Sequence, residues 1–218
     1  MKKLLSYLWP FTKEIPSKIN GTLELTWMNG KKVLDSQNTN YSYGSLQKIL
    51  GYGLSQIDIP ATGTILLLGL GGGSIIQSLK EKFHHQGKII AVEIDEIIIQ
   101  IANNEFGVAP NPNLEIICED ALHYVNKCTQ QFEIIIVDIF IDNTVPESFY
   151  GLAFWQKLKL LVKDKGHIVF NAGIHLQQDP KIKALLSATE PDLEFIKYNH
   201  VLQTNTLIIA QKKQNHIT

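Results

Sequence analysis

The chain has 218 residues, of which 44% are hydrophobic and 19% are charged, proportions that indicate a folded globular protein and not a disordered one. Its 20 basic residues, all of them lysine, stand against 21 acidic residues and leave a formal net charge of −1, which disfavours a basic nucleic-acid-binding protein. Because the sequence contains no arginine, bidentate arginine clamps on phosphate or carboxylate are excluded.

The cysteines and the N-terminal residues indicate in which cellular compartment the protein is expected. Cys118 and Cys128 are ten positions apart, which fits neither a CxxC motif nor a zinc site, so we expect two reduced structural thiols. Residues 1–10 begin like a signal peptide, but the apolar run is short and no small-residue cleavage site follows. No stretch of about 18 apolar residues suggests a membrane span. We therefore expect a cytoplasmic protein that contacts neither membrane nor nucleic acid.

Residues 1–60 are expected to form a small N-terminal region with a β-hairpin and a helix. Residues 22–28 alternate apolar and polar side chains, Asn29-Gly30 follows, and a second extended run covers residues 31–36. Asn-Gly between two extended runs is a strong hairpin signal, because both residues tolerate positive φ. Leucine and isoleucine at helical spacing then predict a helix near residues 44–56.

Residues 61–218 alternate short apolar runs with helical patterns. Continuous apolar runs suit strands that are buried on both faces of a parallel sheet, so the alternation predicts a Rossmann-like, doubly wound α/β domain with a seven-stranded, mainly parallel sheet. The last two strands, 193–201 and 206–210, have a connection too short for a crossover helix and should form an antiparallel hairpin. The other predicted strands are 65–68, 89–92, 114–117, 134–137 and 168–170, and the predicted helices are 74–83, 97–106, 121–126, 150–162 and 180–189.

A glycine-rich loop, residues 69–74 (GLGGGS), connects the first parallel strand directly to a helix. Glycine permits a tight turn and a close approach of ligand to backbone, and the start of the helix offers free N–H groups. No Gly-Lys-Ser/Thr follows the loop, which excludes an ATP-binding P-loop. The loop therefore predicts a different nucleotide or nucleoside ligand.

Acidic residues follow the next two strands. Glu93 lies 24 positions after Gly69, and an acid there can accept hydrogen bonds from ribose hydroxyls. Asp95 is better placed to begin the next helix. Asp120 can either contact an adenine amino group or cap the helix that begins at Ala121. These strand ends predict a crevice for a nucleoside.

Residue types that are absent from the loop and from the sequence exclude some of the possible ligands. A nicotinamide dinucleotide is disfavoured, because Ser74 occupies the position of its third glycine and no arginine could meet a 2′-phosphate. A nucleoside that carries a sulfonium needs only the ribose acid, the adenine contact and backbone around its tail. S-adenosylmethionine or its decarboxylated form therefore fits best as co-substrate. We expect no metal, because the histidines form no ligand constellation.

Three short segments at strand ends form a pattern with the glycine loop: residues 92–95, 119–121 and 136–138. Together they resemble the class I S-adenosylmethionine-dependent transferases. The N-terminal hairpin with residues 39–43 and the segment 138–142 narrow the resemblance to the spermidine synthase family, and the likeness covers roughly residues 21–211, nearly the whole chain. The resemblance implies transfer of a methyl group or, from the decarboxylated donor, of an aminopropyl group.

The resemblance also implies roles for individual side chains. Asp138, after the fourth strand, would orient an acceptor amine and take its proton, Asp142 would anchor the acceptor, and Tyr43 would line the same pocket. These three residues are the predicted catalytic set. The predicted cofactor-binding residues are Gly69, Leu70, Gly71, Gly73, Glu93, Ile94, Asp120, Ala121 and Asp138.

The chain departs from the family pattern where substrate charges would be bound. Gly72 replaces an Asp that binds the ammonium of the decarboxylated donor, and Ser45 replaces a Glu that helps to hold the polyamine. Three residues, not two, separate Asp138 from Asp142. These departures favour methyl transfer to an unidentified small-molecule acceptor, with an amine as one candidate. Aminopropyl transfer is the first alternative, and a non-catalytic nucleoside-binding or assembly protein is the second.

Three further expectations concern single residues and assembly. Asn171 ends the fifth strand and is expected to form a turn. His84 and His85 lie at a helix end before Gly87, where they should be on the surface. The family resemblance is compatible with a homodimer.

Overall fold

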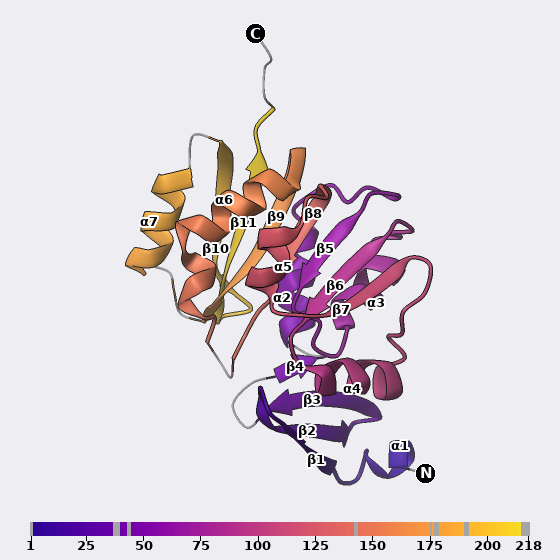
Figure 1. Cartoon of the computed structure of the whole chain (residues 1–218). Helices are drawn as coiled ribbons and strands as arrows, with labels where there is room; N and C mark the ends of the chain where they lie inside the picture. The colour runs from indigo at the N-terminus through magenta and orange to yellow at the C-terminus, as the bar shows by residue number, and fades with distance from the viewer. Residues whose placement is uncertain are drawn as a thin grey trace.

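The structure is a computed structural model, and it describes residues 2–36, 40–42, 45–141, 144–174, 176, 179–189 and 192–214. These residues form a small antiparallel sheet and a larger seven-stranded sheet with helices on both faces (Figure 1). No helix in these ranges is long and apolar enough to cross a membrane.

Four strands build the small sheet, in the order β1-β2-β3-β4. The predicted hairpin joins β2 to β3 and is confirmed: Asn29 (φ 52°) and Gly30 (φ 75°) are the positive-φ pair that this tight turn requires. The sequence analysis missed β1, an exposed edge strand in which Pro16 is tolerated because, among the described residues, no strand other than β2 pairs with it. The short helix α1 (Lys2–Leu5) precedes the strands β1 (Phe11–Ser17), β2 (Gly21–Met28), β3 (Lys31–Ser36) and β4 (Asn40–Ser42).

The large sheet has the strand order β10-β11-β9-β8-β5-β6-β7. Neighbouring strands from β9 to β7 are parallel, whereas β11 is antiparallel to both β9 and β10, which confirms the predicted mainly parallel sheet and C-terminal hairpin. The strand order reverses between β5 and β8, and ligands of open α/β sheets bind at such a switch point. The strands are β5 (Ile65–Leu68), β6 (Ile89–Glu93), β7 (Leu114–Cys118), β8 (Phe132–Val137), β9 (Val162–Ile174), β10 (Leu193–Val201) and β11 (Asn205–Lys212).

Helices cover both faces of this sheet. Along β5, Ile65 and Leu67 join a core with α2 and α3, whereas Leu66 and Leu68 join a core with α5 and α6. Burial on both faces explains why the strand sequences are continuously apolar. The helices are α2 (Ser45–Leu54), α3 (Ser74–Glu81), α4 (Glu96–Phe106), α5 (Ala121–Lys127), η1 (Glu147–Tyr150, a 3₁₀ turn), α6 (Leu152–Leu161) and α7 (Pro180–Thr189).

Helix α4 connects the two sheets. Its Ile98 and Ile101 pack against Leu23, Leu25 and Leu34 of the small sheet, and Figure 1 shows α4 lying between that sheet and the strands β6 and β7. Helix α2, from the expected N-terminal region, packs instead into the core of the large sheet. The division of the chain near residue 60 stays a prediction.

The prediction that His85 is a surface residue is wrong. His85 is only 3% exposed, and its Nδ1 lies 2.7 Å from the carbonyl oxygen of Pro60. The turn after α3 folds back onto the residues before β5, where Gln86 N also donates to Ala61 O at 2.7 Å. This long-range contact, and not the helix end itself, buries the imidazole.

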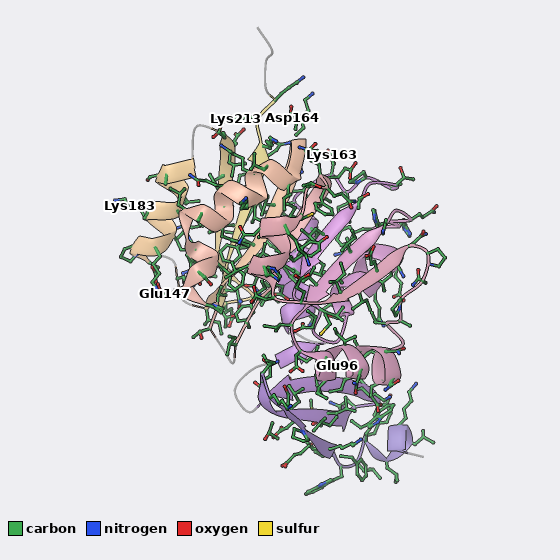
Figure 2. All side chains as sticks on the ribbon, viewed as in Figure 1. Glu96, Glu147, Lys163, Asp164, Lys183 and Lys213 are labelled. Carbon is green, nitrogen blue, oxygen red and sulfur yellow. The ribbon has the colours of Figure 1, made fainter. Side chains whose placement is uncertain are left out.

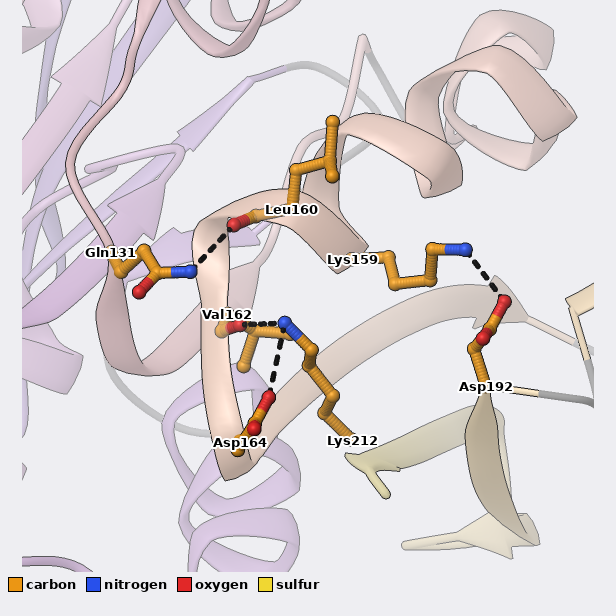
Figure 3. A network of polar contacts seen from close by, with 7 residues as sticks. All are labelled: Gln131, Lys159, Leu160, Val162, Asp164, Asp192 and Lys212. Atoms are coloured by element: carbon orange, nitrogen blue, oxygen red, sulfur yellow. Dashed lines mark hydrogen bonds and ion pairs between the residues drawn. The ribbon is translucent and has the colours of Figure 1, made fainter. Parts of the chain in front are cut away.

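Polar contacts join α6, β9, β11 and the residues just before β8 and β10, at the end of the sheet where β9 begins (Figure 3). Figure 2 places Lys163 and Asp164, at the start of β9, far from Glu147, which follows β8. The contacts therefore lie at the amino ends of the parallel strands, away from the end where a ligand binds. They are Lys212 Nζ to Val162 O (3.0 Å) and to Asp164 Oδ1 (3.4 Å), Lys159 Nζ to Asp192 Oδ2 (2.5 Å) and Gln131 Nε2 to Leu160 O (3.1 Å).

Candidate active site

A cavity opens at the carboxyl ends of β5, β6, β7 and β8, at the switch point of the sheet. The glycine loop and residues that follow the other three strands form most of its wall, and Ile19, Asn20 and Ile98 also line it. The structure thus brings together residues from distant segments of the chain. Seven predicted site residues line the cavity: Gly69, Gly71, Glu93, Ile94, Asp120, Ala121 and Asp138.

The conformation of the loop requires glycine. Gly69 has φ 93°, and a Cβ atom there would lie 2.1 Å from the carbonyl oxygen of Asp138. Only glycine therefore lets the ends of β5 and β8 approach this closely. Leu70 and Gly73 do not line the cavity: the Leu70 side chain lies in the core, and a Cβ on Gly73 would meet Val108 at 2.6 Å. Their predicted ligand contacts could come only from the backbone.

Glu93 is held by backbone donors at the floor of the cavity. Its Oε2 accepts hydrogen bonds from Leu70 N (3.0 Å) and Gly71 N (3.4 Å), and its Oε1 accepts one from Asp95 N (3.0 Å). Burial raises the pKa of this carboxyl, and the three N–H donors oppose the rise. These hydrogen bonds fix the Glu93 carboxylate beside the glycine loop, where Glu93 lines the cavity.

Asp95 begins α4, as predicted, because its Oδ1 accepts a hydrogen bond from Ile97 N at 2.9 Å. Its Oδ2 accepts two more, from Ser17 Oγ and from Asn20 Nδ2. These donors lie at the end of β1 and in the turn that follows it, and this turn brings Ile19 and Asn20 into the cavity wall. The sequence analysis missed this wall, because Asn20 and Asp95 are 75 positions apart and no local pattern connects them.

Asp120 caps α5, since its Oδ1 accepts a hydrogen bond from His123 N at 2.9 Å. The residue also lines the cavity together with Ala121. One of the two roles considered for Asp120, the helix cap, is confirmed. The contact with an adenine amino group stays a prediction, and the position of Asp120 on the cavity wall allows it.

Asp138 follows β8 and contacts Asn171 on β9. Asn171 Nδ2 donates to Asp138 Oδ1 at 2.9 Å. Burial raises the pKa of Asp138 to about 6; the Asn171 hydrogen bond opposes the rise, and the charge of Glu93 adds to it. The prediction that Asn171 forms a turn is wrong: β9 continues to Ile174, and Asn171 is fully buried within it. Its amide is satisfied by side chains and so does not interrupt the strand.

Two members of the predicted catalytic set, Tyr43 and Asp142, lie outside the described residues. Their arrangement around Asp138 therefore stays a prediction. The described residues near Asp142 give the cavity an apolar side, formed by Ile139, Phe140, Ile141, Pro146 and Phe149. Within the described part of the chain, no three His, Cys, Asp or Glu side chains are grouped closely enough to hold a metal ion.

Residues 52–204 match the family described as the spermine/spermidine synthase domain. The match covers more than half of the chain. The chain belongs to this family.

Two curated relatives show the extent of the sequence likeness. A polyamine aminopropyltransferase of Vibrio vulnificus is 31% identical over 115 residues, which are 51% of this chain and 38% of that protein. A polyamine aminopropyltransferase of Thermoplasma volcanium is 23% identical over 169 residues, which are 76% of this chain and 56% of that protein. The chain therefore spans only about half, or less, of the length of these members of the spermidine synthase family.

Solved structures support the fold. A probable spermidine synthase from Corynebacterium glutamicum superposes with a TM-score of 0.67 at 15% identity and covers 96% of this chain and 79% of that one. Human methyltransferase-like protein 13 in complex with SAH superposes with a TM-score of 0.62 at 22% identity, covering 81% and 85%. Both the spermidine synthase and the methyltransferase thus share the Rossmann-like fold that the sequence predicts.

Proposed function

We propose that this member of the spermidine synthase family is a transferase that binds S-adenosylmethionine or its decarboxylated form, and that it transfers a methyl group to a small-molecule acceptor. One observation carries the proposal: the glycine loop, Glu93 and Asp138 converge on a single cavity at the switch point of the sheet. Family membership supports the S-adenosyl donor class.

The chemistry of the cavity fits an S-adenosyl nucleoside. An ionised carboxylate offers about four acceptor positions, and backbone N–H groups use three of those of Glu93. One remains for a ribose hydroxyl. Asp120 and the backbone of Ala121 line the cavity further along and would meet the adenine edge. The apolar side chains of Ile94 and Leu122 would lie against the ring.

Asp138 is suited to act as the base toward an amine. An amine acceptor is protonated at neutral pH and needs a free electron pair in order to attack the methyl carbon on the sulfonium. As the nitrogen–carbon bond forms, the carbon–sulfur bond breaks, and its electron pair leaves with the sulfur as the neutral thioether S-adenosylhomocysteine. With a pKa raised to about 6, Asp138 is ionised at neutral pH and is a stronger base than an ordinary carboxylate. A base with a pKa near the working pH is the most effective in proton transfer. Asp138 would therefore orient the amine and take its proton.

The glycine loop favours methyl transfer over aminopropyl transfer. Gly72 is buried and supplies no carboxylate at the loop position where the family resemblance places one. Beyond Leu70 and Gly71, whose N–H groups bind Glu93, the described loop presents backbone N–H groups and no acidic side chain, which suits the carboxylate of S-adenosylmethionine better than a lone ammonium. Aminopropyl transfer is the second candidate, because the two curated relatives described above are named polyamine aminopropyltransferases. A cytoplasmic location, a homodimer and an amine acceptor stay predictions.

Calorimetric titration with S-adenosylmethionine and, separately, with its decarboxylated form tests the proposal. The two ligands differ by one carboxylate, so their relative affinities report on the surroundings of Gly72. We expect tighter binding of S-adenosylmethionine. Tighter binding of the decarboxylated form would replace methyl transfer by aminopropyl transfer. Binding of neither ligand to the folded protein would overturn the transferase proposal and favour a non-catalytic protein.

A further inference from the structure

A chain of side-chain hydrogen bonds runs from the β10–β11 turn to the candidate base. Asn171 Nδ2 donates to Asp138 Oδ1 at 2.9 Å, Asn205 Nδ2 donates to Asn171 Oδ1 at 2.9 Å, and Thr204 Oγ1 donates to Asn205 Oδ1 at 2.8 Å. Asn171 is fully buried and Asn205 is 3% exposed. These hydrogen bonds thus link the turn of the C-terminal hairpin to the cavity through the interior of the sheet.

The register of the sheet places these residues together. Val137 pairs with Phe170 in the parallel β8–β9 ladder, so the next residues, Asp138 and Asn171, lie side by side. Asn171 pairs with Leu207 on β11, and Asn205, two residues earlier, extends from the same face of that strand. A register shift between Thr206 and Leu207 adds a bulge on β9 beside this site. Bulges next to active sites re-aim side chains.

The Asp138 carboxylate determines the direction of every hydrogen bond in this row of side chains. An ionised Asp138 can only accept, so Asn171 must present its NH₂ group to Asp138 and its carbonyl oxygen to Asn205. The same reasoning makes Asn205 donate to Asn171 and accept from the Thr204 hydroxyl. All donors therefore point toward Asp138. Successive bonds of one direction polarise and strengthen one another in a low-dielectric interior.

We propose that Asn205 is a positioning residue for Asp138, and that it acts through Asn171 by fixing the amide that holds Asp138 Oδ1. Among the described residues, no other hydrogen bond to the Asp138 carboxylate is found. With Oδ1 committed to Asn171, the other oxygen is left for the ligand in the cavity. This inference rests on the proposed role of Asp138 and adds the C-terminal hairpin to the machinery of that site.

The test is a pH titration of the Asp138 carboxyl, observed by carbon-13 NMR in the wild-type protein and in Asn205→Leu. Leucine has the same branched arrangement of side-chain heavy atoms as asparagine, with bulkier methyl groups, and it cannot donate, so Asn171 loses the partner that fixes its amide. Glu93 is the charged group whose field acts on Asp138, and it is unchanged in the variant. We expect the pKa of Asp138 to rise by about half a unit, and by about one unit in Asn171→Leu, because a hydrogen bond to the charged form is weakened or lost.

Thr206→Val is the matched control. Thr206 follows Asn205 on β11, is fully buried, and its hydroxyl has no hydrogen-bond partner within the described residues. The variant therefore changes the same part of the strand and should leave the titration of Asp138 unchanged. A folded Asn205→Leu protein in which Asp138 titrates as in wild type would overturn the proposal. So would an equal shift in Thr206→Val, which would indicate a general packing effect.

A second variant covers the case in which Asn205→Leu does not fold. Asn205→Ala removes the donor without adding a charge and without the bulk of the leucine methyl groups. It should raise the pKa of Asp138, whereas an unchanged titration would again contradict the proposal. The titration needs neither donor nor acceptor substrate. Its outcome is therefore separate from the calorimetric test of the transferase function, which can fail on its own.

Discussion

Asn20 Nδ2 donates a 2.7 Å hydrogen bond to Asp95 Oδ2, and this contact joins the small N-terminal sheet to the cavity at the switch point. The same carboxylate caps α4 and accepts from Ser17 Oγ, while the backbone N–H of Asp95 donates to Glu93. The β1–β2 turn, the start of α4 and the floor of the cavity therefore form one connected unit. Loss of the Asp95 carboxylate should disturb all three.

Asp95→Ala is expected to lower the free energy of unfolding by about 2–3 kcal/mol, because it removes a helix cap and leaves two side-chain donors without their acceptor. Urea denaturation measures the loss. Asp120→Ala is the matched control: Asp120 caps α5 through His123 N and has no comparable link to another sheet, so about 1 kcal/mol is expected. Equal losses in the two variants would contradict the linking role of Asp95.

Gly69→Ala is expected to destabilise the protein far more than Gly107→Ala. Both glycines have positive φ, 93° and 70°, but a Cβ at Gly69 would lie 2.1 Å from Asp138 O, whereas nothing lies within 4 Å at Gly107. Backbone strain alone costs about 1–2 kcal/mol in Gly107→Ala. In Gly69→Ala the new Cβ would also force the ends of β5 and β8 apart, so we expect a total loss in the free energy of unfolding of about 3 kcal/mol or more. Chemical denaturation compares the two, and similar losses would contradict the close approach.

The large sheet and the cavity could be predicted because their signals are local. A strand buried on both faces has to be apolar, as in residues 65–68, and a backbone forced to positive φ has to be glycine, as at Gly69. Acids at strand ends, such as Glu93, meet at one edge because parallel strands share a direction. These constraints act within a few positions of the chain, so the residues themselves carry them.

Contacts between distant segments left no such signal. Asn20 reaches the cavity only because β1 and β2 pack on α4, and Asn171 is tolerated inside β9 only because Asp138 and Asn205 satisfy its amide. An asparagine at the end of an apolar run is a turn former by local preference, and here the tertiary hydrogen bonds outweigh that preference. The burial of His85 has the same origin.

Glu93→Gln is expected to weaken the binding of S-adenosylmethionine by about 10- to 100-fold, because a neutral amide is a weaker acceptor for a ribose hydroxyl than a carboxylate is. Calorimetry measures the change. Glu96→Gln is the control: Glu96 is three residues away, exposed on α4 (Figure 2) and not part of the cavity wall. If Glu93→Gln binds S-adenosylmethionine as tightly as the wild-type protein does, Glu93 does not bind the ribose.

Asp138→Asn is expected to slow transfer strongly and to weaken donor binding much less, because asparagine keeps the shape of the side chain and one acceptor oxygen but is not a base. Loss of a general base typically lowers the rate by about 10²- to 10⁴-fold, and in the wild-type enzyme the rate should fall below about pH 6, where Asp138 becomes protonated. Initial rates against pH, with calorimetry of donor binding alongside, separate the two effects. A variant that retains the wild-type rate would show that another group takes the proton.

The same substitution should make the protein more stable at neutral pH. The pKa of Asp138 is raised from 3.8 to about 6 in the folded protein, so the folded state binds this proton more tightly than the unfolded chain does. The free energy of unfolding therefore falls as the pH rises from about 4 to about 6, and above that it stays lower by up to about 3 kcal/mol. Asp138→Asn removes this cost. Its stability should exceed that of wild type at pH 7 and approach it at pH 4 in urea denaturation, and a variant less stable than wild type at pH 7 would contradict the raised pKa.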